Sequence, residues 1–260
     1  MTVKIGISPI AWQNDDLPDL TKDFTMEQAL KESREIGYTG VERGQRMPHD
    51  TEGLRSYLEK YDIGLCGGWC SGNLLNNSAS EECDAVQRQV DQFIALDAPC
   101  VVFAECSNTV QGMIDVPVND RPQLTRDEIK AYAEKLTEVA KWMQDRGMPM
   151  AYHHHMGSII EAEEDVNWLM EYSDPEALKL TFDTGHLLFG GGDVLATLDR
   201  WGDRVHHVHF KDIRPDVVAD VREANEVSAQ HPQVVDEMRQ LMEKEASTIW
   251  STSHKEDPQC

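Results

Sequence analysis

Residues 125–155, TRDEIKAYAEKLTEVAKWMQDRGMPMAYHHH, contain the pattern that decides the fold. Thr125 and Glu128 have the spacing of a capping box, which predicts a helix over residues 126–146. The helix ends before Gly147, because glycine readily takes the left-handed backbone conformation that follows many helices. The apolar run over residues 149–154 is typical of a buried strand. The stretch therefore predicts one helix followed by one strand.

The same alternation of strand and helix patterns occurs along most of the chain, and it predicts repeated βα units around a parallel sheet. Seven strands are expected, over residues 3–8, 40–43, 64–69, 100–105, 149–154, 179–183 and 204–209. Six helices are expected, near residues 26–36, 51–60, 81–96, 126–146, 162–172 and 193–200. A single α/β barrel usually takes about 200 to 250 residues, so we predict an α/β fold of the (β/α)8 TIM-barrel type.

The pattern changes after Arg214, and no eighth strand is visible. Residues 231–246 are typical of one amphipathic helix, and residues 254–260 form a polar tail. We therefore expect residues 1–220 to form a barrel of seven βα units without the usual eighth, and residues 221–260 to form an atypical helix and tail.

Composition excludes several classes of partner. The formal net charge of -23 disfavours binding to nucleic acid and to anionic membrane surfaces. No apolar run is long enough to span a membrane, and the first residues lead into a strand pattern without a signal peptide, which favours a cytoplasmic protein. The six cysteines are scattered, so a disulfide framework is not expected.

Polar and aromatic residues follow the predicted strands at the ends where active sites of α/β barrels are built. These candidates are Trp12, Glu42, Trp69, Glu105, His153, His154, His155, Asp183, His186, His209 and Lys211. Their position predicts a functional site at the C-terminal face of the sheet.

Several of these residue types suit a divalent metal. Asp183 ends an apolar strand, where an unpaired charge costs several kcal/mol, roughly, unless a cation balances it. A helix N-cap or a pair with a nearby lysine or arginine is the alternative. Strand alternation puts His153 and His155 on one side and His154 on the other, and it puts His207 on the same face as His209. His209 is nearer the catalytic end and is the better ligand of that pair.

The sequence resembles the xylose isomerase-like barrel superfamily, and within it the inosose dehydratase family. The similarity runs from about residue 4 to 218. Its motifs are GISPIAW (6–12), NDDLP (14–18), GYTGVE (37–42), AYHHHMG (151–157), FDTGH (182–186) and HVHFKDIRP (207–215). From about Val221 the chain leaves the pattern of the family.

The resemblance implies a divalent ion, Mn²⁺ or Co²⁺, held at the ends of the fifth to eighth strands. Asp183 and His209 match two ligands of the superfamily, and His153 stands where many relatives have a glutamate. The eighth strand, which supplies a last glutamate in relatives, has no visible counterpart. The resemblance also implies a role for glutathione and leaves a homo-oligomer open.

The activity implied is dehydration of a cyclic polyol ketone, scyllo-inosose (2-keto-myo-inositol), in inositol catabolism. The expected metal ligands are His153, Asp183 and His209; Lys211, His154 and His155 are the candidates for proton transfer and catalysis. Trp12, Glu42, Trp69, Glu105 and His186 are expected to bind substrate. A ketose isomerase or epimerase of the same superfamily is the alternative enzyme, and a non-catalytic remnant is the alternative if the missing strand removes activity.

Overall fold

The structure, a computed structural model, describes residues 5–15, 18–113 and 115–213. The helix predicted over residues 231–246 and the polar tail lie outside the described residues, so the predicted boundary at residue 220 stays a prediction. Within the described residues, no helix has both the length and the apolar character needed to cross a membrane.

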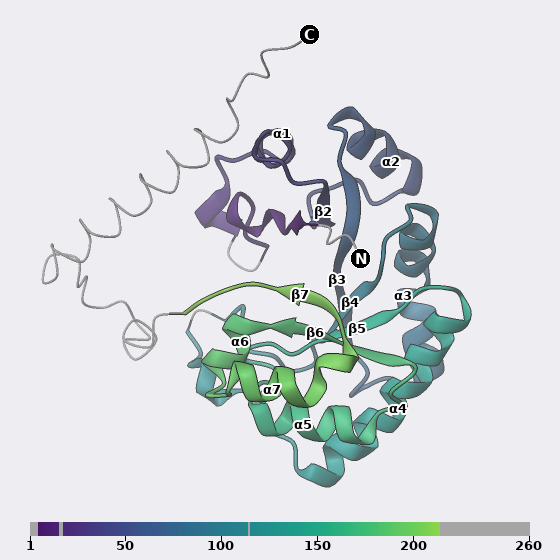
Figure 1. The fold of residues 1–260 in the computed structure, drawn as a ribbon, viewed down its shortest axis with the longest axis vertical. Helices are drawn as coiled ribbons and strands as arrows, with labels where there is room; N and C mark the ends of the chain where they lie inside the picture. Colours follow the sequence, from purple (N-terminus) through teal and green to yellow (C-terminus); the bar gives the residue numbers. More distant parts are fainter. Residues whose placement is uncertain (1–4, 16–17, 114, 214–260) are drawn as a thin grey trace, which may run out of the picture. The chain divides into compact units, whose positions relative to one another are not determined.

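Seven strands form one parallel sheet in which each strand pairs with its neighbours in sequence. They are β1 (Gly6–Ile7), β2 (Gly40–Arg43), β3 (Gly64–Gly72), β4 (Val101–Glu105), β5 (Met150–His153), β6 (Leu178–Asp183) and β7 (Val205–His209). Helices connect the strands, and Figure 1 shows α3, α4, α5 and α7 along the outside of the curved sheet. The predicted α/β barrel architecture is confirmed, with seven strands in the described part of the chain.

The α-helices lie close to their predicted positions. They are α1 (Met26–Ile36), α2 (Thr51–Lys60), α3 (Ala79–Ala95), α4 (Arg126–Asp145), α5 (Glu163–Tyr172), α6 (Thr184–Phe189) and α7 (Val194–Trp201). Short 3-10 helices lie at η1 (Pro9–Ala11), η2 (Pro18–Thr21), η3 (Val118–Asp120) and η4 (Gly202–Arg204). Helix α6 is a single short helix that starts directly after β6, and it is not among the helices expected from the sequence.

Helix α4 illustrates why these segments fold as they do. Thr125 and Glu128 form the predicted capping box, in which each side chain accepts a hydrogen bond from the other residue's backbone N–H. One face of α4 is buried against the sheet, and its residues recur at helical spacing: Ile129, Tyr132, Ala133, Leu136, Val139, Ala140 and Met143. This face and the apolar strands β4 to β6 share the main core.

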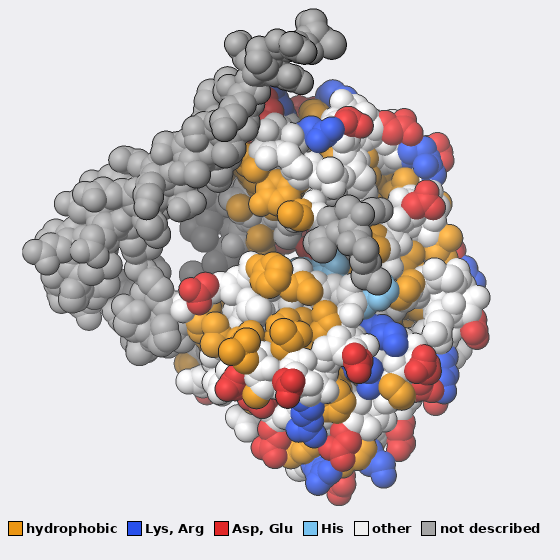
Figure 2. Space-filling view, in the orientation of Figure 1, with side chains coloured by type: hydrophobic (Ala, Val, Ile, Leu, Met, Phe, Trp, Pro, Cys, Tyr) orange, Lys and Arg blue, Asp and Glu red, His pale blue; other side chains and the backbone are white. Residues whose placement is uncertain are grey.

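Apolar side chains are exposed at the β7 edge of the fold. Leu188 of α6, Leu195 and Leu198 of α7, Val208 of β7 and Phe210 all expose large apolar surfaces, and Figure 2 shows hydrophobic side chains gathered over these elements. In a complete barrel, an eighth βα unit would pack against this edge.

Sheet register brings the candidate residues together. Asp183 lies opposite His209 across β6 and β7, and His153 lies opposite Thr181 across β5 and β6. Because all strands are parallel, these positions share the C-terminal edge of the sheet. The fold therefore places the histidines and Asp183 within reach of one another.

Candidate metal centre

Asp183 is the centre of the site and is fully buried. Its Oδ1 accepts a hydrogen bond from the backbone N–H of His186 at 2.9 Å and so caps α6. Its Oδ2 lies 2.5 Å from Lys211 Nζ and also faces two imidazoles. The helix cap and the lysine pair considered as alternatives to a metal ligand thus both occur, and Oδ2 still faces the histidines.

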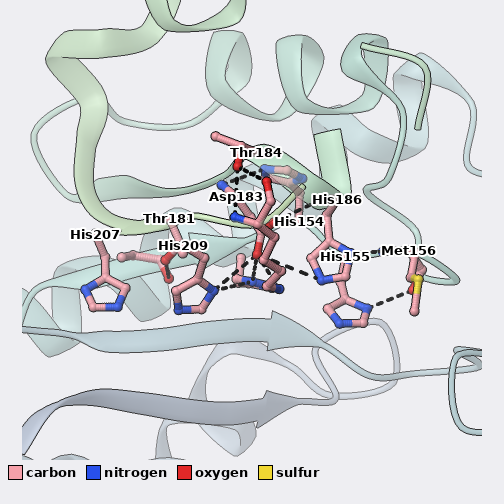
Figure 3. A network of polar contacts seen from close by, with 12 residues as sticks. His154, His155, Met156, Thr181, Asp183, Thr184, His186, His207 and His209 are labelled. Atoms are coloured by element: carbon pink, nitrogen blue, oxygen red, sulfur yellow. Dashed lines mark hydrogen bonds and ion pairs between the residues drawn. The ribbon is translucent and has the colours of Figure 1, made fainter. Parts of the chain in front are cut away.

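Ring nitrogens of His153 and His209 converge on Oδ2 of Asp183, and Figure 3 shows His209 next to Asp183. His153 Nε2 lies 3.2 Å from Asp183 Oδ2 and 3.0 Å from His209 Nδ1, and His209 Nδ1 lies 3.3 Å from Asp183 Oδ2. Two donors bound about 2.1 Å from one ion at octahedral or tetrahedral angles are separated by about 3.0 to 3.4 Å. The three spacings fit ligands of a single ion.

Either a shared metal ion or protonated imidazoles can hold the atoms of this triangle together. A proton between His153 Nε2 and His209 Nδ1 can satisfy that one contact, but each nitrogen also points at the same carboxylate oxygen. A positive charge, from a metal ion or from a protonated imidazole, stabilises three such atoms held this close. Two imidazoles and one carboxylate suit late first-row divalent ions.

Protonation in the metal-free site follows from the same contacts. Burial opposes ionisation of Asp183, but hydrogen bonds from His153 and His209 outweigh it and place its pKa well below the usual range. Burial lowers the pKa of His153 strongly, so this imidazole is neutral. Burial also disfavours a charged His209, but hydrogen bonds to Asp183 and Glu42 raise its pKa to about 9. With this pKa, His209 is protonated at neutral pH and places a positive charge beside Asp183.

Two further histidines, His155 and His186, face each other beside this triangle, with ring centroids 3.8 Å apart. His155 Nδ1 lies 2.8 Å from the backbone oxygen of Met156, and His186 Nδ1 accepts the backbone N–H of Met156 at 3.4 Å. A carbonyl oxygen accepts a hydrogen bond only from an N–H, so a neutral His155 carries its proton on Nδ1, whereas a neutral His186 carries its proton on Nε2. Figure 3 shows both rings near Met156, and their contacts with its backbone favour opposite tautomers in the neutral rings.

Burial is the main cause that lowers the pKa of His186 far below its usual value, which keeps the ring neutral. His186 Nε2 lies 3.9 Å from Asp183 Oδ2, and it is buried without a hydrogen-bond partner among the described residues. His154 lies apart from this group, because its Nε2 accepts the backbone N–H of Asp183 at 3.4 Å. Burial lowers the pKa of His154 to about 4.

A second carboxylate lies across the sheet. Glu42, at the end of β2, places Oε1 2.8 Å from His209 Nε2 and 2.9 Å from His207 Nε2. Burial opposes its charge, but these two hydrogen bonds outweigh burial and hold the pKa of Glu42 far below its usual value. Glu42, His207 and His209 form one group of close ligand-type atoms, and His153, Asp183 and His186 form another.

Of the three remaining candidates, Trp69 contacts the histidines, whereas Trp12 and Glu105 have hydrogen bonds to other parts of the fold. Trp69 lies at the cluster, with its ring 5.4 Å from those of His153 and His155 in edge-on contact. Trp12 donates its indole N–H to Glu32 of α1 at 2.5 Å. Glu105 accepts the backbone N–H groups of Leu74 and Ser107 and so braces the loops after β3 and β4.

Sequence reasoning gave no role to His207 or to the backbone of Met156. The alternation of β7 had already placed His207 on the face of His209, so the signal for it was present. The hydrogen bonds of Met156 come from its backbone, and residue type gives no signal for them.

Comparison with known proteins places these features in context. The sequence profile described as xylose isomerase-like TIM barrel matches residues 30–239. The chain is 40% identical over 225 residues to the rhizopine catabolism protein MocC of Rhizobium meliloti, covering 86% of this chain and 69% of the relative. It is 38% identical over 221 residues to inosose dehydratase of Clostridium perfringens, covering 85% and 74%. It is 36% identical over 225 residues to inosose dehydratase 2 of Bacillus cereus, covering 86% and 76%.

Solved structures share the fold at low sequence identity. The probable 3-DHS dehydratase AsbF of Bacillus anthracis superposes with a TM-score of 0.60 at 13% identity, covering 81% of this chain and 74% of AsbF. The 3-keto-D-glucoside 4-epimerase YcjR of E. coli superposes with a TM-score of 0.59 at 14% identity, covering 81% and 80%. These likenesses concern the fold alone.

Proposed function

This chain belongs to the xylose isomerase-like TIM barrel family, and we propose that it is a metal-dependent carbon-oxygen lyase that dehydrates scyllo-inosose (2-keto-myo-inositol) in inositol catabolism. The observation that carries the proposal is the triangle formed by His153, Asp183 and His209, with spacings of 3.0 to 3.3 Å. Relatives named inosose dehydratase, 36% and 38% identical to this chain, support the substrate.

His153, Asp183 and His209 would hold the ion. A donor set of two nitrogens and one oxygen fits Mn²⁺ or Co²⁺ better than Mg²⁺, which prefers oxygen ligands. When bound, the ion supplies Lewis acidity that makes the proton next to a ketone easier to remove.

His155 is the residue placed best for taking that proton. Met156 O holds the proton of His155 on Nδ1, so the lone pair is on Nε2. Trp69 packs edge-on against His155, which holds the ring in place. His154 is turned toward the backbone of Asp183, so of the two candidate bases we assign the role to His155.

His186 and Lys211 complete the proposed reaction. The Nε2–H of His186 is a buried donor suited to an enolate oxygen. The Lys211 ammonium, next to Asp183, protonates the departing β-hydroxyl, which leaves as water. One proton thus moves from carbon to His155 and one from Lys211 to the leaving oxygen. The C–O bond breaks as the C=C bond forms.

The test is turnover by the purified chain. Incubation with scyllo-inosose and Mn²⁺ or Co²⁺ should produce an ultraviolet-absorbing cyclohexane dione, and Asp183→Asn should abolish the product. Protein that binds metal but forms no dione with either ion would refute the dehydratase. A product that keeps all its oxygens would instead identify an isomerase or epimerase.

A further inference from the structure

His209 uses its two ring nitrogens in different directions. Nδ1 points at His153 and Asp183, with distances of 3.0 and 3.3 Å. Nε2 points at Glu42 Oε1, 2.8 Å away. A neutral imidazole carries a proton on one of its two nitrogens, and a carboxylate oxygen accepts a hydrogen bond only from that protonated nitrogen. With Nε2–H donated to Glu42, the lone pair of neutral His209 is on Nδ1 and faces the triangle.

Glu42 is itself fixed by a second ring. His207 Nε2 lies 2.9 Å from the same Oε1, so two of the three imidazoles of β7, those of His207 and His209, hold one oxygen of a carboxylate carried by β2. The side chain of Glu42 is 10% exposed, which leaves little access to water. This arrangement ties β7, the last strand of the described sheet, to a strand far from it in the sheet order.

We propose that Glu42, held by His207, is a positioning residue that orients His209 and sets its tautomer for metal binding. This inference rests on the proposed metal site. It gives Glu42 a role different from the substrate contact expected from its place at a strand end. A carboxylate that accepts the outer N–H of a metal-bound histidine fixes the ring and strengthens it as a ligand.

His153 provides a contrast within the same site. Its outer nitrogen, Nδ1, is buried and has no hydrogen-bond partner among the described residues. Its ring is instead held by packing between Trp69 and the neighbouring histidines. Of the two proposed histidine ligands, only His209 has a carboxylate on its outer nitrogen among the described residues. Metal affinity should therefore depend on Glu42 through His209.

The test measures metal affinity in the absence of substrate. Glu42→Gln keeps the size and an acceptor oxygen but loses the charge, and we expect Mn²⁺ affinity to fall about 10- to 100-fold. Glu42→Leu removes the acceptor oxygen as well, and its Mn²⁺ affinity should fall further than that of Glu42→Gln. Glu82→Gln is the matched control, because this buried carboxylate accepts hydrogen bonds from Asn73 and Asn77 away from the histidines, and the Mn²⁺ affinity of the variant should equal that of the parent.

Proton NMR of the Co²⁺-loaded protein adds a readout that a purely structural role would not change. The parent should show a solvent-exchangeable, hyperfine-shifted N–H resonance from His209 Nε2, protected by Glu42. In Glu42→Gln this resonance should broaden through faster exchange, while urea unfolding of the metal-free protein, compared with the Glu82→Gln control, checks the fold.

Three outcomes would overturn the proposal. Glu42→Gln with Mn²⁺ affinity within twofold of the parent would show that His209 needs no orienting carboxylate. Two ions per parent chain, with one lost in Glu42→Gln, would make Glu42 a ligand. If the parent protein binds no metal, His209 is not a metal ligand and Glu42 cannot orient it for metal binding. None of these measurements depends on turnover, so a failure of the dehydratase proposal is seen separately.

Discussion

Arg121, which follows η3, holds the segment between β5 and α5 and the first turn of α5, and its removal should destabilise the protein strongly. Its Nε lies 3.1 Å from Glu161 Oε1, and its Nη2 lies 2.8 Å from Asp165 Oδ2. Its Nη1 donates to the backbone oxygen of Ser158 at 3.2 Å. All three charged side chains are about one-tenth exposed. Arg121→Met keeps much of the volume and leaves two buried carboxylates without their cation.

Removing one partner of a buried ion pair costs about 3 to 5 kcal/mol. Both carboxylates keep other donors, since Glu161 Oε2 accepts from Gly157 and Asp165 Oδ2 accepts from Ala162. We therefore expect the lower end, about 3 kcal/mol of unfolding free energy, which for a chain of this size lowers Tm by roughly 6 to 12 °C.

The unfolding free energy lost in Arg121→Met should also depend on pH. Burial raises the pKa of Glu161, and Arg121 opposes that rise. Without Arg121 the folded-state pKa rises further, so the folded protein binds more protons than the unfolded chain over a wider range. Stability then falls as pH rises through that range, and the deficit of Arg121→Met should be smaller at about pH 5.5 than at about pH 8.

Urea unfolding of the metal-free protein measures this cost without a contribution from metal binding. Arg126→Met is the control, because Arg126 pairs with Glu171 on the surface, with side chains 54% and 44% exposed. Its removal should cost less than about 1 kcal/mol. Equal losses in the two variants would refute the reasoning that burial makes the Arg121 contacts stabilising.

Two further predictions concern the site. Lys211→Met should lower kcat by about 10²- to 10⁴-fold without weakening Mn²⁺ binding, because the ammonium competes for Asp183 Oδ2; weaker Mn²⁺ binding would contradict this. Gly185→Ala should lower kcat at unchanged metal content, since an added Cβ would lie 2.6 Å from Lys211 Cβ. Gly112→Ala, where an added Cβ meets nothing within 4 Å, is its control, and equal kcat in both variants would show that the position of Lys211 does not matter.

The fold was predictable because its signals are local. The capping box at Thr125 and the apolar periodicity of the helix that follows placed α4 almost to the residue. Helix α6 was not predictable in the same way, because Thr184 and Gly185 are weak helix formers. Its start depends on Asp183 Oδ1, which accepts the N–H of His186. In the sequence, Asp183 fits both a ligand and a helix N-cap, and residue type does not distinguish the two.

The residues of the site were predictable for a related reason. Parallel strands end at one edge of the sheet, and side chains alternate along each strand, so Asp183 and His209 are expected to be neighbours once β6 and β7 are recognised. The ring orientations were not predictable. They depend on contacts such as that between Glu42 and His209, which are 167 positions apart in the chain.

The two oxygens of Asp183 show why residue type alone cannot settle a role. Oδ1 is committed to the N-terminus of α6, which fixes the plane of the carboxylate, and that plane directs Oδ2 at His153 and His209. On the opposite side of His209, Glu42 fixes the ring in a similar way. A helix cap and a hydrogen-bonded carboxylate, each of which alone indicates a structural role, together hold two of the three proposed ligand atoms, those of Asp183 and His209, at a spacing that suits one ion. Structural and functional interpretations of these residues are therefore not alternatives, because the ligand geometry requires the structural contacts.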